Sequence, residues 1–138
     1  MHYRSKILIA TLTSLTIVSH YVSAADKAPS DTILTPLQQH TFTDIAGKEG
    51  VMLTVEYAPG ASTPKHKHDA HTFVYVLEGA IEMQVEGGKK ITLGPGQTFY
   101  ESPTDVHSIS KNASTTKPAK FLVFFVKNKD APPLMSVQ

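Results

Sequence analysis

Between residues 51 and 126 the chain is a succession of short strand-like segments, each ended by glycine, proline or a polar turn. Val51–Tyr57 and Ala80–Glu86 alternate apolar and polar side chains, which is typical of strands with one buried face. Turn signals such as Gly87-Gly88 and Gly94-Pro95-Gly96 recur about every eight to twelve residues. The chain shows no convincing amphipathic helix, so the pattern predicts an all-β sandwich or barrel.

Two of the expected strands, Thr72–Leu77 and Ala119–Val126, are apolar on both faces. Such strands need a cover on each side, and in a small barrel the outer cover is often a second subunit. We therefore expect a homodimer. Several aromatic side chains are interpreted as core rather than as the wall of a pocket: Phe73, Tyr75, Phe99 and Tyr100.

The first 24 residues have the pattern of a secretory signal peptide. Arg4 and Lys6 precede a mostly apolar run, and Val22-Ser23-Ala24 places small residues at the expected cleavage position. Cleavage after Ala25 fits nearly as well. The pattern predicts export to the periplasm or beyond, with no membrane association once the signal is removed. Residues 25–32 are expected to be a linker, residues 33–127 the barrel, and residues 128–138 a flexible tail.

Charge and composition exclude several function classes. The chain has no cysteine, and so no disulfide, thiol nucleophile or cysteine-bound zinc. Of its thirteen basic residues, Arg4 and Lys6 lie in the expected signal peptide, so eleven lysines remain against twelve acidic residues. The expected mature chain thus contains no arginine, the residue suited to paired contacts with phosphate and guanine. We expect no nucleic-acid partner.

The histidines carry the chemistry that the sequence offers. His66, His68 and His71 lie within six residues, and His107 follows about forty residues later. Side chains at i and i+2 of a strand project from the same face, so His66 and His68 can share a site that a remote histidine completes. Imidazole is a ligand for transition metals, whereas the alternative is a set of solvated surface histidines.

The region from Gly60 to Asn112 resembles a cupin domain. The first cupin motif reads G-x5-H-x-H-x3,4-E-x6-G, and here Gly60, His66, His68 and Gly79 match it, with Thr72 at the glutamate position. The second motif reads G-x5-P-x-G-x2-H-x3-N. Gly96, His107 and Asn112 follow it, with Ser102 and Thr104 at its proline and second glycine positions and one residue more between histidine and asparagine. The segment VYVLEGAIEMQVEGG between the motifs is also cupin-like.

This resemblance implies a single double-stranded β-helix, the jelly-roll barrel. It also implies that His66, His68 and His107 bind a divalent transition metal: Fe, Mn, Ni, Cu or Zn. Thr72 cannot replace a carboxylate ligand, and His71 is a further candidate although strand parity places it on the opposite face from Thr72. For Glu101, six residues before His107, we prefer a solvated side chain to one that orients an imidazole.

Three function classes remain open, because the fold alone does not choose among them. The first is a metal-dependent enzyme, with a dioxygenase-like reaction on a small organic substrate as the leading example. The second is a non-catalytic protein that binds a metal or small ligand. The third is a barrel without metal. No residue is assigned a catalytic role, and no organic cofactor site is recognised.

Overall fold

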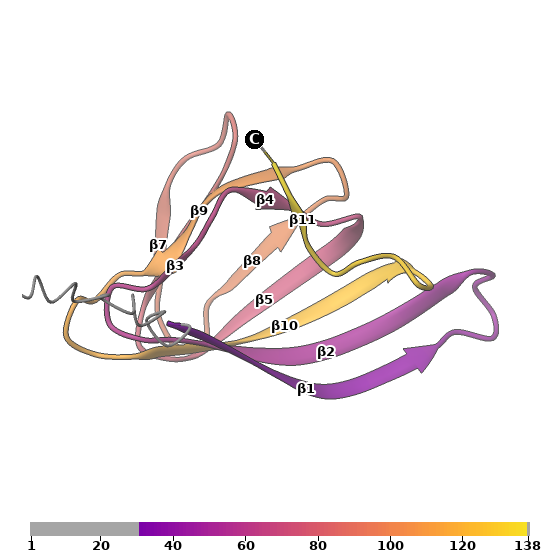
Figure 1. The fold of residues 1–138 in the computed structure, drawn as a ribbon, viewed down its shortest axis with the longest axis horizontal. Helices are drawn as coiled ribbons and strands as arrows, with labels where there is room; N and C mark the ends of the chain where they lie inside the picture. The colour runs from indigo at the N-terminus through magenta and orange to yellow at the C-terminus, as the bar shows by residue number, and fades with distance from the viewer. Residues whose placement is uncertain (1–30, 138) are drawn as a thin grey trace, which may run out of the picture.

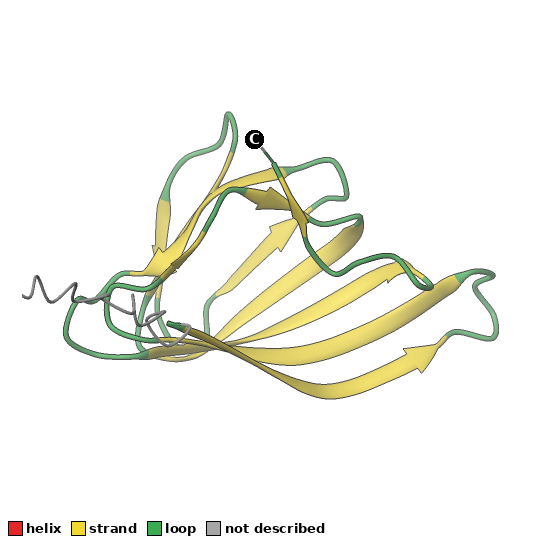
Figure 2. Ribbon diagram, in the orientation of Figure 1, coloured by secondary structure: helices red, strands yellow, loops and turns green. Residues whose placement is uncertain are grey.

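The protein is described by a computed structural model that covers residues 31–137. Every regular element in this part of the chain is a β-strand (Figure 2). No helix in the described range is long and apolar enough to cross a membrane. The strands are β1 (Thr32–Thr41), β2 (Lys48–Tyr57), β3 (Ser62–Thr63), β4 (His66–Lys67), β5 (Ala70–Glu78), β6 (Ile81–Val85), β7 (Ile91–Leu93), β8 (Thr98–Glu101), β9 (Val106–Asn112), β10 (Ala119–Asn128) and β11 (Met135–Ser136).

The strands form two antiparallel sheets that face each other (Figure 1). One sheet has the order β1-β2-β10-β5-β8, and the other has the order β11-β4-β9-β6-β7 with β3 also paired to β9. Neighbouring strands are far apart in sequence, as in the β2–β10 and β5–β10 pairs. This is the predicted all-β jelly roll, and the fold prediction is confirmed.

The core lies between the sheets because alternate side chains of the long strands point inward. In β10, Phe121, Val123 and Phe125 are buried, and in β5 the alternation buries Val74 and Val76. The other sheet contributes Ile81 and Met83 from β6, both almost fully buried. An apolar interior of this kind supplies the driving force for closing two sheets on each other.

Two residues of the cupin motifs have structural roles, Gly79 in the turn after β5 and Asn112 at the end of β9. Gly79 turns β5 into β6 with a φ of 72°, and a Cβ added there would lie 2.5 Å from the Pro118 carbonyl oxygen. Asn112 is buried and its amide donates to the carbonyl oxygens of Ala58 at 3.0 Å and Lys117 at 2.8 Å. Its Oδ1 accepts a hydrogen bond from the Ser114 amide at 2.9 Å.

The structure differs from the sequence-based expectation at the C-terminus, where we expected a flexible tail from residue 128. β10 runs to Asn128, and after a short loop β11 pairs with β4, placing Met135 opposite Lys67. In Figure 1 this last segment leaves the first sheet and crosses to the second. The expected signal peptide at residues 1–24 and most of the expected linker lie outside the described residues.

The aromatic residues of β5 and β8 are a second difference. Phe73, Tyr75 and Tyr100 are 44–48% exposed, so the prediction that they form core is wrong. Only Phe99 packs against the core. Successive side chains of a strand point to opposite faces. In β5 the exposed Phe73 and Tyr75 occupy outward positions, and they alternate with the buried Thr72 and Val74.

Candidate metal centre

Three histidines from two neighbouring strands meet inside the barrel. His66 on β4 pairs directly with His107 on β9, and His68 follows β4 by one residue. One ring nitrogen from each lies within 4.8 Å of the others. All three side chains are buried, at 3–7% exposure. The structure therefore brings together the three residues predicted from spacing and resemblance, and the solvated alternative does not hold for them.

Backbone carbonyls fix the orientation of two of these rings. His66 Nδ1 is 2.8 Å from the Pro64 carbonyl oxygen, and His68 Nδ1 contacts the carbonyl oxygen of Pro133. A carbonyl oxygen only accepts, so Nδ1 carries the proton and Nε2 retains its lone pair. Metal-ligating histidines are held in this way, with one nitrogen donating to a carbonyl and the other facing the metal.

The electrostatics also favour neutral imidazoles. Burial lowers the pKa of His66 below its ordinary value of 6.5, although its hydrogen bond to the Pro64 carbonyl opposes the change. Burial likewise lowers the pKa of His68, against the effect of the Pro133 carbonyl and the Glu101 carboxylate. Only the neutral ring can donate a lone pair, so both rings are in the ligand form at neutral pH.

Glu101 is the site residue that the sequence analysis weighed but wrongly interpreted as solvated. It is 2% exposed rather than solvated, and its Oε2 lies 3.2 Å from His107 Nδ1 and 4.0 Å from His68 Nε2. Glu101 lies on β8 directly opposite Thr72 of β5. Thr72 is buried as expected for the motif position, and its Oγ1 has no hydrogen-bond partner. The signal that could have pointed to Glu101 is Thr72, because it leaves the first motif without a carboxylate.

His71 lies apart from the cluster. Its side chain is exposed on the outward face of β5, and its Nδ1 is 2.7 Å from the hydroxyl of Tyr100. The three clustered histidines do not include it. Strand parity had placed His71 opposite Thr72, and the burial of Thr72 beside the exposure of His71 agrees with that alternation.

A cavity of about 100 Å³ opens beside the histidines. Its polar lining includes Tyr57, Thr63 and Ser110, whose hydroxyls are hydrogen-bonded to one another through Tyr57. Most of the wall is apolar: Leu34, Leu53, Val55, Val74, Met83, Phe121, Val123, Phe125, Pro133 and Leu134. Among residues 31–137, no lysine or arginine lines this cavity. The space is larger than one water molecule needs and suits a small organic molecule.

The donor set fits a divalent transition metal. Both ring nitrogens of His107 and Oε2 of Glu101 are buried without a hydrogen-bond partner among the described residues. Buried polar atoms are almost always paired, so three unpaired atoms at one point indicate a missing partner. A cation at this point would take the lone pair of one His107 ring nitrogen and offset the charge of the buried Glu101 carboxylate, and it would leave coordination positions that face the cavity.

Comparison with curated proteins finds a relative of this chain. Over 60 residues the chain is 35% identical to the pectin degradation protein KdgF of Dickeya dadantii, which covers 43% of this chain and 54% of that protein. The chain thus spans about half the length of this curated relative.

Two solved structures share the fold. The polyketide cyclase RemF of Streptomyces resistomycificus matches with a TM-score of 0.60 and 26% identity, over 78% of this chain and 72% of that chain. KdgF from Halomonas sp. matches with a TM-score of 0.59 and 21% identity, over 75% of this chain and 84% of that chain.

Fold and site together define a small jelly-roll barrel with an inward-facing group of three histidines. The cupin domain family model matches residues 53–125, which is more than half of the chain. The chain belongs to the cupin family.

Proposed function

We propose that this protein is a metal-dependent cupin enzyme that acts on a small organic substrate. The single observation that carries the proposal is the convergence of His66, His68 and His107, within 4.8 Å of one another, beside a buried cavity. Two of the rings have Nδ1 committed to backbone carbonyls, so their Nε2 atoms are left for a ligand. Purely structural histidines would not need lone pairs aimed at one point.

The reaction class that the cavity favours is an oxygenase reaction. A redox-active divalent metal held by the three histidines would supply Lewis acidity and electron transfer to dioxygen. The chain's own residues supply the rest: the apolar walls, including Val74 and Phe121, exclude water and pack against the substrate, and the Tyr57 hydroxyl can donate to a polar group on it. A mainly apolar cavity with few hydroxyl groups favours a compact, mainly apolar or aromatic substrate with one or two metal-binding oxygen atoms.

A second candidate is activity on a sugar acid. The observation in its favour is the similarity to the pectin degradation protein KdgF, at 35% identity over 60 residues. Pectin fragments carry many hydroxyls and a carboxylate, which require donors and a cation in the site. The cavity offers few hydroxyl partners and no lysine or arginine, so a sugar acid would depend on the metal for charge balance.

Substrate screening separates these two reactions. The protein is loaded with Fe²⁺ or Mn²⁺ and offered small phenols, diketones and unsaturated sugar acids from pectin digestion. Oxygen uptake with a compound of the first two kinds supports the oxygenase. Conversion of a sugar acid without oxygen uptake supports the second candidate. A matched His107→Ala variant shows whether activity requires the site. Ligands that raise the melting temperature without turnover would identify the non-catalytic binding protein instead.

We also propose that the protein is a homodimer. The outward face of β5 and β8 exposes Phe73, Tyr75, Leu77 and Tyr100, each at 44–48%. Exposed large side chains grouped on one sheet face are typical of a subunit interface. Light scattering should give twice the chain mass, and Tyr75→Glu should shift it to the monomer. A monomeric wild-type protein would refute this part of the proposal.

Export is a further part of the proposal. It rests on residues 1–24, where Arg4 and Lys6 precede an apolar run and Val22-Ser23-Ala24. Amino-terminal sequencing of the protein recovered from the periplasm or medium should begin at Ala25 or Asp26. An uncleaved protein confined to the cytoplasm would contradict it.

A further inference from the structure

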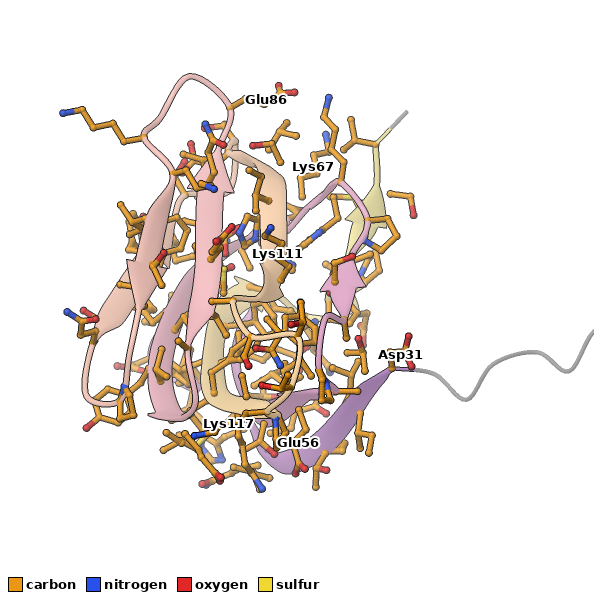
Figure 3. The ribbon with its side chains drawn as sticks, turned by 90° about the vertical axis from the view of Figure 1, so that its left-hand side faces the viewer. Asp31, Glu56, Lys67, Glu86, Lys111 and Lys117 are labelled. Atoms are coloured by element: carbon orange, nitrogen blue, oxygen red, sulfur yellow. The ribbon has the colours of Figure 1, made fainter. Side chains whose placement is uncertain are left out.

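Glu101 occupies an unusual position for a carboxylate. Its side chain is 2% exposed in the centre of the barrel, and no lysine or arginine lines the cavity beside it. By contrast, charged side chains such as Glu86 and Lys117 lie at the edges of the molecule (Figure 3). Burying a carboxylate without a compensating cation is strongly unfavourable. A positive partner inside the barrel would offset this cost.

The contacts of Glu101 indicate what that partner is. Its Oε2 lies 3.2 Å from His107 Nδ1, yet neither atom has a hydrogen-bond partner in the part of the chain that the structure describes. Ligands about 2.1 Å from a transition metal and at right angles to each other are separated by about 3 Å. The Oε2–Nδ1 distance is thus what two adjacent ligands of one ion would show. His68 Nε2, at 4.0 Å from the same oxygen, lies within reach of that ion.

The register of the sheet explains how a carboxylate reaches this point. The cupin motif places its glutamate on the strand that here is β5, where Thr72 stands instead. Thr72 is paired with Glu101 across the β5–β8 ladder, and both side chains point inward. Directly opposed residues in an antiparallel pair have Cβ atoms about 4.5–5.5 Å apart. A glutamate on β8 can therefore deliver its oxygen to nearly the same place as one on β5.

We propose that Glu101 is the fourth ligand of the metal, so that β8 supplies the carboxylate that β5 lacks. This inference rests on the proposed function, because it requires that the three histidines bind a metal. The resulting set of three imidazoles and one carboxylate carries a single negative charge. This ligand set binds ions with affinity for both nitrogen and oxygen, such as Mn²⁺ and Fe²⁺, better than a set of histidines alone would. An octahedral ion would keep about two positions open to the cavity.

The first test compares metal affinities in the intact protein. Glu101→Gln keeps the size of the side chain and removes its charge, and Glu86→Gln is the matched control because Glu86 is exposed in an ion pair with Lys65. Titration with Mn²⁺ should show at least about a tenfold weaker affinity for Glu101→Gln and no change for Glu86→Gln. Equal affinities for wild type and Glu101→Gln would overturn the inference. A wild-type protein that binds no metal would overturn the proposed function itself.

The second test asks whether a carboxylate reaches the metal from either strand. The double variant Thr72→Glu/Glu101→Thr moves the carboxylate back to β5. It should recover most of the Mn²⁺ affinity lost in Glu101→Gln, because the charge again reaches the metal. A folded double variant that recovers none of this affinity would contradict the inference.

The crystal structure of the Mn²⁺-loaded wild-type protein provides an independent answer. A Glu101 oxygen within about 2.3 Å of the ion is expected. A distance beyond about 3 Å, with Glu101 hydrogen-bonded to His107, would overturn the inference even if the swap variant did not fold.

Discussion

The C-terminal segment orients a ligand of the proposed metal, so its removal should weaken metal binding. The Pro133 carbonyl oxygen accepts the hydrogen bond from His68 Nδ1, and β11 holds this segment against β4. Deleting residues 132–138 removes the acceptor and opens the cavity at Pro133 and Leu134. Loss of such an outer hydrogen bond lowers metal affinity about 10- to 100-fold, which corresponds to about 1.4–2.7 kcal/mol.

The barrel itself should tolerate this deletion. The segment contributes a two-residue strand at the sheet edge, and Leu134 is 42% exposed. Two to three backbone hydrogen bonds at about 1 kcal/mol each set the scale of the stability change. The control deletes residues 136–138 only, which shortens β11 but keeps Pro133 and Leu134. The loss of metal affinity should therefore depend on whether the Pro133 carbonyl is present, and not on the number of residues removed.

Isothermal titration with Mn²⁺, supported by circular dichroism to verify folding, measures this difference. The longer deletion should bind about 10- to 100-fold more weakly than full-length protein, and the shorter deletion should bind within about threefold of it. Equal affinity of full-length protein and the folded longer deletion would refute the role of Pro133. Equal losses in both deletions would show that β11, and not the carbonyl, matters.

Four further outcomes are expected. In the metal-free protein the free energy of unfolding should fall as pH drops below 6.5. The pKa values of His66 and His68 are lowered in the folded state, so the unfolded chain binds more protons in this range. Urea unfolding at pH 7.5 and 5.5 measures the change, and equal stability at both pH values would contradict the burial argument. Asn112→Ala loses four hydrogen bonds, of which the one to the Tyr57 carbonyl is long at 3.4 Å, and should destabilise the barrel by about 3 kcal/mol, seen as a fall of about 12 °C or more in melting temperature. Gly79→Ala meets the Pro118 carbonyl at 2.5 Å with a positive φ and should cost about 1–3 kcal/mol in the same assay, whereas Gly87→Ala lacks the contact and should cost less. His71→Ala should leave Mn²⁺ affinity unchanged, and a loss there would show that the ligand assignment is wrong.

Local patterning was sufficient to predict most of the strands and the shared side of His66 and His68. Alternation located β2 and β6, and an apolar run located β5. The i and i+2 spacing placed His66 and His68 on one side of an extended segment. The meeting with His107 could not be read from spacing, because it depends on the β4–β9 pairing between residues about forty positions apart. The resemblance to the cupin motifs supplied that link.

Glu101 and the C-terminal segment were predicted wrongly for a common reason, which is that their environment is set by distant partners. Glu101 is buried because β8 pairs with β5 in a register that opposes it to Thr72. The polar, proline-containing tail has the composition of a loose end, yet β4 has an open edge that β11 completes. Composition alone does not reveal either pairing. Phe73 and Tyr75 were expected to be buried and are exposed. Their burial also depends on distant partners, because these decide which face of the sheet is covered.

The central claim is that His66, His68 and His107 hold one divalent transition metal. The most direct measurement is metal per chain by mass spectrometry, on protein purified without an affinity tag or chelator, with a matched His66→Ala/His107→Ala variant. We expect close to one Fe, Mn, Ni, Cu or Zn per chain in the wild type, and below about a tenth in the variant. A wild-type protein below about a tenth, and not restored by soaking in these metals, would contradict the claim.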